Sequence, residues 1–579
     1  MKFNSHFLLL LAFCVFALAP LTAPGYFIYA HDARHSVYFL QMFDAALRDG
    51  AWYPRWAADM TFGYGYPVWL ILAPLPFFVG EAFHLVGFDF VSAVKIVDGL
   101  AMICSALTMY LFASRVLGKN AGLVAAIAYI YIPYHLVDLY VRAAQAELVS
   151  FVFPPLVCWA FYELAMTRQP RYIPLAACAY AGLILAHVSM AVLFTPIIAL
   201  YLLFLLFTVR PTTEDGRRLN SVFRLPSSVD LGLGSSLAIV LALGLAAISW
   251  LPVLFEQKYL TSDPLIGGFF NYRKHFLNAN QLLSPFWGYG YAGENGTDQF
   301  SLQLGLIPTM LAVVALGAIA KTRGTIRAHI TLFAAITGLI VFWMLPLSAA
   351  LWEPFAAVIG FLQFPWRLLI VTTFALAFLS GAALHAFQDD ARERAPALAI
   401  GLIFVAASYA YTQPQYTDAV FNYQTQMEFE TQSGELLGDT IWMTGERPQD
   451  SPLVEQYVNG EKLQKAIALD DGAKIETTRY GGQSTDLRVD ARAPTRVMVY
   501  TRYFPGWTAV IDSQPVEIEP SGDQGLILVR VPAGSHIVRL RFEDTPIRQI
   551  GAAISALGVL LTFFFLLGSC PLVVKNPKV

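Results

Sequence analysis

A cluster of ionisable residues follows the first hydrophobic segment of the chain. Within Tyr29-Ala-His-Asp-Ala-Arg-His35, the carboxylate of Asp32 stands between His31 and His35. A carboxylate held beside a hydroxyl can accept its proton as a general base, which contributes roughly 10²–10⁴ in rate. We therefore take Asp32 as a candidate catalytic residue.

Two other interpretations of the same stretch stay open. Histidines at i and i+4 share one face of a helix, so His31, Asp32 and His35 are candidate ligands of a divalent metal. Alternatively, Asp32 caps the amphipathic helix expected from Ser36 to Leu47, and capping is compatible with catalysis. The sequence leaves the cofactor unknown.

A second charged group stands in the short loop Tyr140-Val-Arg-Ala-Ala-Gln-Ala-Glu147, between two apolar segments. Charges beside a membrane are costly unless they are paired or functional. Arg142 and Glu147 either pair with each other or with headgroups at a helix boundary, or belong to a cleft shared with Asp32. His187, between two later apolar runs, either lines such a cleft or marks a turn.

Basic residues further along the chain could bind an anion. Arg367 ends the motif that begins at Gln363, Gln-Phe-Pro-Trp-Arg, and a guanidinium suits a phosphate through its bidentate fork. Arg273, Lys274 and His275 in the loop 257–302 are further candidates for binding a lipid phosphate. The alternative for the motif 363–367 is an anchor that contacts ordinary lipid headgroups.

The amino-acid composition indicates what kind of structure must position these residues. Of 579 residues, 56% are hydrophobic and only 14% are charged, which is typical of polytopic membrane proteins. The net charge of −3 gives no basic footprint for nucleic acid and excludes that class of partner. All five cysteines fall inside apolar runs, so we expect neither a disulfide framework nor a cysteine metal knot.

About twelve apolar segments are long enough to be transmembrane helices. The first is expected to be an uncleaved helix rather than a signal peptide. The segments are 5–23, 93–113, 120–139, 147–166, 171–189, 190–209, 231–256, 303–320, 328–346, 366–387, 396–411 and 547–568. Prolines and a glycine interrupt the apolar stretch Tyr66–Phe90, which we expect to be re-entrant or interfacial.

Charge sets the expected orientation. The basic loops at 115–119, 168–171, 210–224, 321–327, 392–394 and 575–578 all fall on one side if the segments alternate. By the positive-inside rule that side is cytoplasmic. The opposite side then receives a large first loop, 24–92, together with the loops that carry Glu147 and Arg367 and the long polar stretch 412–546.

The stretch 412–546 is expected to form a small exported β-sandwich-like domain. Residues 497–503 and 526–531 have strand patterns, and Pro532–Ser535 makes a turn to a half-exposed partner strand around 538–542. The motif Tyr503-Phe-Pro-Gly-Trp507 either binds sugar or forms a core turn, and we favour the turn. Before the strands, Glu428, Glu430 and Glu435 are candidates for a loop over the membrane-facing cleft.

Several stretches resemble a known superfamily. They are Gly63-Tyr-Gly-Tyr-Pro67 with Pro74-Leu-Pro76, Ile132-Pro-Tyr-His135, Arg142 to Glu147, Ser284-Pro-Phe-Trp-Gly-Tyr-Gly290, Gln363 to Arg367, Tyr503 to Trp507 and Val531-Pro-Ala-Gly-Ser-His536. With the large first loop and the exported domain, they resemble the GT-C glycosyltransferase superfamily. More narrowly, they resemble bacterial membrane proteins described as 6-pyruvoyl-tetrahydropterin-synthase-related, and YfhO-type proteins. Nothing in the chain resembles the zinc site of a soluble pterin synthase.

The resemblance implies a mainly α, polytopic GT-C-like domain over 1–411, an exported β-rich domain over 412–546, and a final transmembrane helix with a cytoplasmic tail over 547–579. It implies inverting transfer of a sugar from a polyprenyl-phosphate donor to an envelope lipid or glycan acceptor, on the extracytoplasmic face of the bacterial inner membrane. Asp32 matches the first-loop acid that acts as general base, and Glu147 matches the second acid.

The sequence departs from the superfamily in one respect, because the second loop offers Glu147 without an adjacent aspartate. The role of the second acid is therefore open. Two alternatives to a glycosyltransferase are a transporter or flippase of lipid-linked glycans, and a non-enzymatic envelope assembly factor. A transporter needs charges deep in several spanning helices.

Overall fold

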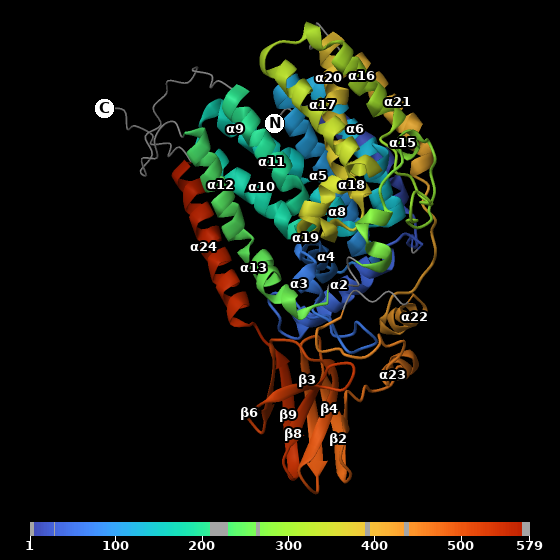
Figure 1. Cartoon of the computed structure of the whole chain (residues 1–579), viewed down its shortest axis with the longest axis vertical. Helices are drawn as coiled ribbons and strands as arrows, with labels where there is room; N and C mark the ends of the chain where they lie inside the picture. Colours follow the sequence, from blue (N-terminus) through green and yellow to red (C-terminus); the bar gives the residue numbers. More distant parts are fainter. Residues whose placement is uncertain are drawn as a thin grey trace, which may run out of the picture.

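The computed structural model describes residues 5–27, 29–208, 230–261, 267–387, 394–433 and 439–569. A tall body of helices carries a β-domain at one end (Figure 1). The basic loop 210–224, Arg392, Glu435, Cys570 and the tail 575–578 lie outside the described residues.

Each of the twelve expected apolar segments contains a helix. In chain order they are α1 (Ser5–Leu18), α5 (Phe90–Leu117), α6 (Lys119–Tyr131) with α7 (Pro133–Val137), α8 (Gln145–Ser150) with α9 (Phe153–Thr167), α10 (Tyr172–Ala186), α11 (Val188–Thr208), α12 (Leu231–Leu245) with α13 (Ala247–Glu256), α16 (Leu306–Gly317), α17 (Gly324–Met344), α20 (Leu369–Phe387), α21 (Ala395–Ser408) and α24 (Pro546–Ser569).

The number of spans is smaller than twelve by length and composition. Among the described residues, seven helical stretches are long and apolar enough to cross a membrane, and two bent pairs raise the number to nine. The helices α10, α16 and α21 are apolar but shorter. The chain is thus a polytopic, mostly helical membrane protein, and a count of twelve spans is not confirmed.

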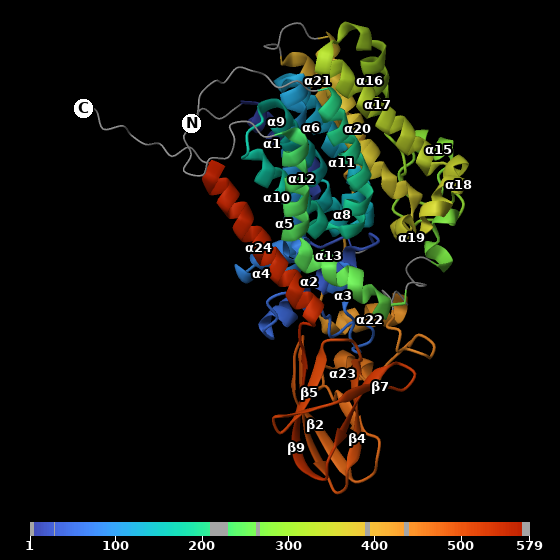
Figure 2. The same cartoon turned by 60° about the vertical axis from the view of Figure 1, so that its left-hand side comes forward.

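Helix α20 is the centre of the helical body. It is apolar on all sides, as a helix surrounded by protein should be, and 94% of its span from Pro365 is buried. Its Gly381 packs so closely on α6 that a Cβ there would lie 2.5 Å from the carbonyl oxygen of Ala121. By contrast, only 22% of α24 is buried, and this helix runs along the outside beside α12 and α13 (Figure 2). Its exposed leucine and phenylalanine side chains suit a lipid environment.

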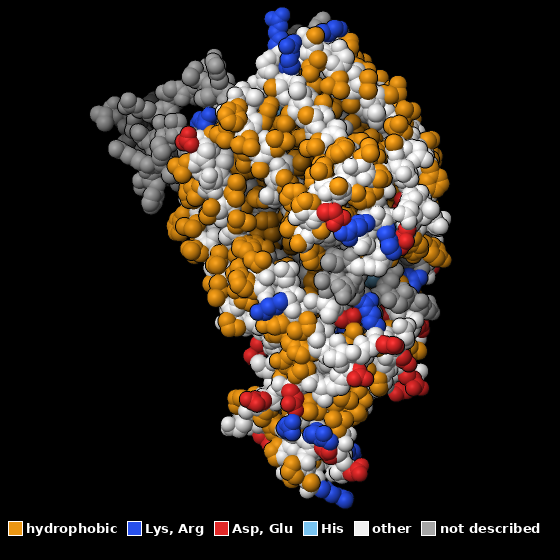
Figure 3. Space-filling model, in the orientation of Figure 1, with side chains coloured by type: hydrophobic (Ala, Val, Ile, Leu, Met, Phe, Trp, Pro, Cys, Tyr) orange, Lys and Arg blue, Asp and Glu red, His pale blue; other side chains and the backbone are white. Residues whose placement is uncertain are grey.

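The surface agrees with a membrane-embedded body. Hydrophobic side chains cover most of its upper part, and the charged side chains in this view lie at the top end, in a group on the right at mid-height and around the β-domain (Figure 3). At the end away from the β-domain the charged side chains in this view are mainly Lys and Arg, whereas both signs mix around the β-domain.

The first loop, 24–92, folds under the body as α2 (Ala33–Arg48), α3 (Val68–Ile71) and α4 (Leu75–Leu85). Aromatic residues from the three helices, including Phe43, Trp69 and Phe77, pack together in one buried cluster. Helix α4 spans only about 16 Å, roughly half of a hydrocarbon core. Neither α3 nor α4 is long enough to cross a bilayer alone, in keeping with the proline-interrupted stretch.

The β-domain consists of two antiparallel sheets. One has the order β1-β4-β8-β7 and the other β2-β3-β9-β5-β6. The strands are β1 (Ala466–Ala468), β2 (Ala473–Tyr480), β3 (Ser484–Ala491), β4 (Thr495–Arg502), β5 (Trp507–Ile511), β6 (Gln514–Val516), β7 (Ile518–Ser521), β8 (Leu526–Val531) and β9 (Gly534–Phe542). Alternating residues such as Val497, Val499, Val538 and Leu540 are fully buried in a shared core, as expected for stacked sheets.

One expectation about these strands is wrong. The turn Pro532–Ser535 was expected to join 526–531 to its partner strand, but β8 pairs with β4 and β7 while β9 pairs with β3 and β5. The turn therefore carries the chain from one sheet to the other. Alternation shows which face of a strand is buried, but it does not identify the neighbouring strand.

A segment of the first loop inserts into the C-terminal region, and we call this segment, Asp59–Tyr66, the clasp. Its backbone turns through two left-handed residues, Thr61 (φ 54°) and Phe62 (φ 59°). The turn is held by side chains from 368 to 402 residues further along the chain: Glu430 accepts from Phe62 N at 2.7 Å, Ser451 Oγ donates to Phe62 O at 2.6 Å, and Lys465 Nζ donates to Gly63 O at 2.5 Å. Glu430 belongs to α22 (Tyr423–Ser433), which with α23 (Val454–Asn459) precedes the strands.

The motif Tyr503-Phe-Pro-Gly-Trp507 forms a second junction. Trp507 is buried and packs edge-on against Trp56 of the first loop, with ring centroids 5.5 Å apart. The carbonyl of Pro505 accepts from Arg548 of α24 at 2.9 Å, and Arg548 also pairs with Glu256 of α13 at 2.9 Å. The motif is a core turn that ties the β-domain to two membrane helices, which is the interpretation that we favour over sugar binding.

Candidate active site

A break in one membrane helix places the central residues of the site. Helix α6 ends at Tyr131 because Pro133 cannot continue its hydrogen bonding, and the following segment is bent by 44°. The turn Asp138–Arg142 is a π-helix, a form that is frequent at functional sites. It closes at Ala143, whose left-handed φ of 49° is unusual for alanine.

The side chains of this turn form a buried ion cluster. Arg142 contacts Asp138 through Nη1, and the same nitrogen lies 2.9 Å from Glu147 Oε2. The three side chains are 3%, 0% and 1% exposed. Tyr134 OH donates to Glu147 Oε1 at 2.7 Å. Arg142 and Glu147 therefore pair with each other, as the simpler interpretation held, but in the protein interior rather than at headgroups.

Arg367 completes the cluster from the 3-10 turn Pro365–Leu368, which leads into α20. Its Nε lies 3.7 Å from Glu147 Oε2, and the neighbouring Trp366 ring faces the Arg142 guanidinium at 4.9 Å. Within the described residues its one hydrogen bond runs from Nη1 to Leu362 O at 3.2 Å, and 15% of the side chain is exposed. Arg367 is thus the cation of the cluster whose N–H donors are mostly unused within the described residues, as an anion-binding arginine requires.

Asp32 is attached to this cluster through the backbone. Its N–H donates to Arg142 O at 2.7 Å, and His31 N–H donates to Val141 O at 3.1 Å. Asp32 occupies the N-cap position of α2, yet its side chain makes no capping bond. Nor does the half-buried carboxylate make another hydrogen bond or ion pair within the described residues. It interacts electrostatically with Arg142 and Arg367.

The structure therefore brings four of the expected residues together: Asp32, Arg142, Glu147 and Arg367. The sequence missed Asp138 and Tyr134. An acid inside an apolar segment, four residues before an arginine, was an available signal for Asp138. Tyr134 stands in the stretch Ile132–His135 that carries the resemblance, but its residue type alone does not indicate a contact with Glu147.

Of the two roles that the sequence left open for His187, the structure shows the turn. His187 separates α10 from α11, and its half-buried imidazole interacts electrostatically with Glu147, Arg367 and Asp32. It therefore marks a turn and lies beside the cluster.

The two histidines on either side of Asp32 have other partners. His31 Nε2 lies 3.0 Å from Gly290 O, and its ring stacks on Tyr291 at 5.1 Å. Burial lowers the pKa of His31, so the imidazole is neutral near pH 7. His35 packs against the ring of Phe429 at 5.3 Å. In the part of the chain that the structure describes, no three His, Cys, Asp or Glu side chains are placed to share a metal ion, so the expected set His31, Asp32 and His35 finds no support.

The basic residues of the loop 257–302 do not join the cluster. Arg273 pairs with Glu353 at 2.6 Å and Lys274 with Glu294 at 2.8 Å, all at the surface. His275 is buried and bonded to Phe269 O at 2.6 Å, and its ring packs on Phe364. The charges of this loop are therefore neutralised locally.

Gln363, the first residue of the Arg367 motif, has a left-handed backbone (φ 62°). This conformation turns the chain sharply just before Phe364 and Trp366, whose rings stack at 4.6 Å. The residue therefore shapes the approach to Arg367.

Comparison with known proteins gives a partial match. The family model described as dolichyl-phosphate-mannose-protein mannosyltransferase matches residues 72–214, about a quarter of the chain. These residues include the Arg142 turn and Glu147. Over that part, the match confirms the resemblance to membrane glycosyltransferases of the GT-C superfamily. No curated protein sequence matches the chain.

Among solved structures, the chain is similar to the arabinofuranosyltransferase AftD from Mycobacteria. The identity is 14% over 93% of this chain and 40% of that one, with a TM-score of 0.46. A mutant form of the same protein matches with 14% identity, 93% and 42% coverage and a TM-score of 0.45. This chain thus spans well under half the length of the structures it matches.

Proposed function

We propose that this protein transfers a sugar from a polyprenyl-phosphate donor to a hydroxyl of an envelope lipid or glycan, with inversion at the anomeric carbon. The observation that carries the proposal is the carboxylate of Asp32. It is half-exposed and makes no side-chain hydrogen bond or ion pair within the described residues, and its backbone N–H fixes it to Arg142, which organises the buried ion cluster. A carboxylate with no structural duty beside two arginines is suited to chemistry.

The proposed reaction uses three groups of residues. Asp32 accepts the proton of the acceptor hydroxyl, whose oxygen attacks the anomeric carbon from the side opposite the phosphate. The bond from that carbon to the phosphate oxygen breaks, and the phosphate leaves with the electron pair. Arg367 stabilises the charge on the leaving phosphate. Arg142, Asp138 and Glu147 hold Arg367 and the Asp32 backbone in place.

The role left open for the second acid is positioning rather than proton transfer. Glu147 is 1% exposed and surrounded by Tyr134, Arg142 and Arg367. A carboxylate buried among three partners and closed off from solvent is not positioned to take a proton from a substrate hydroxyl.

We further propose that the site and the stretch 412–546 face the outside of a bacterial inner membrane. The distribution of charge supports this, because Lys and Arg dominate the end of the molecule opposite the β-domain in the view shown (Figure 3). The family model supports a lipid-linked sugar as donor through its dolichyl-phosphate-mannose description.

The test is the purified Asp32→Asn variant, assayed with radiolabelled polyprenyl-phosphate mannose and a bacterial envelope fraction as acceptor. We expect a loss of roughly 10²–10⁴ in turnover with an unchanged thermal midpoint, because the side chain supports nothing structural. Full turnover by Asp32→Asn would refute the general base. Movement of the donor across the membrane without sugar release would favour the flippase instead.

Asp89→Asn is the matched control in the same loop. The Asp89 carboxylate caps α5 by accepting from Ser92 N at 2.9 Å. This variant should keep turnover and at most lose part of the cap's contribution to stability, since asparagine also caps well.

A further inference from the structure

A pocket of about 250 Å³ lies between α2 and α22, next to the proposed site. Its walls come from the first turns of α2 and from the segment that precedes the β-domain. The lining residues are Arg34, Tyr38, Ala419, Val420, Phe421, Thr425, Glu428 and Phe429. We call it the α2–α22 pocket. The two walls are joined by a hydrogen bond from Tyr38 OH to Thr425 Oγ1 at 3.0 Å.

The pocket contains two opposite charges that do not pair with each other. The Arg34 guanidinium lies over the Phe429 ring at 4.9 Å and makes no hydrogen bond or ion pair within the described residues. The Glu428 carboxylate accepts only from Gln424 of its own helix, at 3.3 Å, in the same part of the chain. Five N–H donors and a carboxylate oxygen are therefore available to a ligand.

The remaining lining is aromatic. Phe429 stacks on Tyr38 with centroids 6.1 Å apart, and Phe421 meets Tyr38 at 5.4 Å. A sugar has hydroxyls that both donate and accept hydrogen bonds, and a C–H face that packs on aromatic rings. It therefore matches a pocket lined by aromatic rings with one donor group and one acceptor group. Because the two charges cancel, the pocket suits a neutral ligand. Its volume is small for a whole ligand and fits the end of a longer one.

The pocket lies close to Asp32 along the chain, because its lining residue Arg34 belongs to the same turn. Arg34 follows Asp32 by two residues in the first turn of α2. Phe429 contacts both Arg34 and His35, and residues three apart such as Asp32 and His35 share a helix face. A chain that enters the pocket can therefore present its terminal hydroxyl to the carboxylate.

We infer that the α2–α22 pocket binds the neutral, hydroxyl-rich end of the acceptor glycan. The inference rests on the proposed function for its role, although binding itself does not require catalysis. It also gives α22 a function, because α22 and the segment before it form the wall of the pocket that faces α2.

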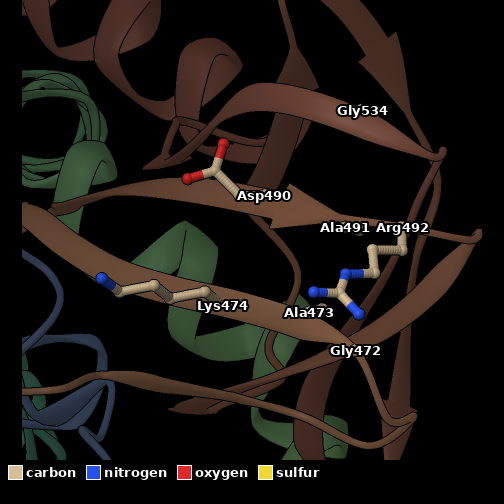
Figure 4. A pocket seen from close by; sticks show the side chains of 7 residues that line it. All are labelled: Gly472, Ala473, Lys474, Asp490, Ala491, Arg492 and Gly534. Atoms are coloured by element: carbon tan, nitrogen blue, oxygen red, sulfur yellow. The ribbon is translucent and has the colours of Figure 1, made fainter.

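A larger groove in the β-domain supplies the control residues for a binding experiment. It measures about 550 Å³ and is lined by Lys474, Asp490 and Arg492 with four small residues (Figure 4). It lies at the end of β2 where Ala473 pairs with Ala491. The other end of β2 carries Tyr480, which donates to Asp59 in the clasp. Seven residues of strand, roughly 23 Å, separate the two ends, so a glycan end in this groove does not reach the proposed site.

The experiment measures binding of the full-length protein, in detergent, to an array of neutral oligosaccharides of mannose, glucose, galactose and arabinose beside acidic uronic-acid oligosaccharides. We expect the wild type to bind at least one neutral oligosaccharide. Arg34→Gln and Glu428→Gln should each weaken that binding about tenfold or more at an unchanged thermal midpoint. Lys474→Gln and Arg492→Gln, in the groove of the β-domain, should leave it unchanged.

Asp32→Asn separates this inference from the proposed function. That variant should lose turnover and keep glycan binding. If the pocket variants lose glycan binding and Asp32→Asn keeps it, the result supports glycan binding in the pocket, whether or not the enzyme assay detects turnover. The inference is overturned if no neutral oligosaccharide binds, if only acidic ones bind, or if binding depends on Lys474 and Arg492 rather than on Arg34 and Glu428.

Discussion

Asp32 and Glu147 are both acids at one end of the helical body, but their surroundings are opposite. Asp32 has no side-chain partner within the described residues, whereas Glu147 contacts two arginines and a tyrosine. A buried carboxylate of this kind stabilises the fold only as long as its partners remain. Single substitutions should therefore separate a chemical residue from a positioning one.

Glu147→Gln should destabilise the helical body. It leaves Arg142 and Arg367 with a surplus of buried positive charge, and breaking a buried ion pair costs about 3–5 kcal/mol. The measurement is the thermal midpoint in detergent. Glu353→Gln is the control, because it breaks the exposed pair with Arg273 and should leave the midpoint unchanged. Equal midpoints for the two variants would contradict the positioning role.

Glu430 should make the clasp sensitive to pH. Burial raises its pKa from 4.5 to about 7. Between these values the folded state binds more protons than the unfolded state, so stability falls as the pH rises from about 5 to 7. Glu430→Gln keeps an acceptor for Phe62 N and should abolish this fall, measured as thermal midpoint or protease resistance against pH. A fall of the same size in the variant would assign it to other groups.

Lys465 does not obscure that measurement. Burial lowers its pKa from 10.5 to about 7, so its effect on stability lies above pH 7. There the unfolded state binds more protons, and stability rises with pH.

At the scale of elements, the apolar segments were predictable and their breaks were not. Hydrophobic length indicates where a helix lies, and all twelve expected segments contain one. The π turn at Asp138–Arg142 depends on Pro133 and on contacts with Glu147 and Tyr134 that only the fold brings together. The pairing of β8 and β9 was mispredicted for the same reason, since neighbouring strands are chosen by tertiary packing.

The site was predictable to the extent that its residues are charged. Asp32, Arg142, Glu147 and Arg367 stand out as ionisable residues beside apolar runs. Arg273 and Lys274 stand out equally, yet Glu353 from another segment and Glu294 from the same loop pair with them. Local sequence does not show which partner a surface charge will meet.

The glycines of the clasp give a test at this scale. Gly65 has φ +81°, and a Cβ there would lie 2.6 Å from the Trp56 ring. Gly65→Ala should therefore lower the thermal midpoint and expose the segment 412–465 to protease. Gly460 also has a left-handed φ, +66°, but a Cβ there would meet nothing within 4 Å. Gly460→Ala should cost only the backbone strain, about 1 kcal/mol, and a larger effect than that of Gly65→Ala would count against the clasp.

At the scale of the whole molecule, the two ends differ in charge and in fold. The basic end is expected inside and the β-domain outside. In a cysteine-free background, Ser535→Cys on β9 should react with a membrane-impermeant maleimide in intact bacteria. Lys321→Cys, in the loop before α17, should react only after permeabilisation. Both residues are exposed, so the reverse pattern would invert the proposed orientation.

The junctions make the membrane body and the β-domain depend on each other. Arg548 is fully buried and contacts Glu256 of α13 and Pro505 of the β-domain. The clasp adds contacts from the first loop. Domains joined by buried polar contacts of this kind move as one unit more readily than domains joined by a linker.

The clasp also sets an order of events during biosynthesis. Gly63 and Lys465 are 402 residues apart, and at about 5–20 residues per second a ribosome needs roughly 20–80 s to make the chain between them. On the proposed orientation, the first loop crosses the membrane before the groups that hold its turn have been made. The Phe429 ring, which packs on Arg34 and His35 close to Asp32, also comes late in the chain. On the proposed orientation, a chain terminated before residue 412 would carry Asp32 on the outer side without the contacts of the clasp and of α22, and we expect it to be inactive.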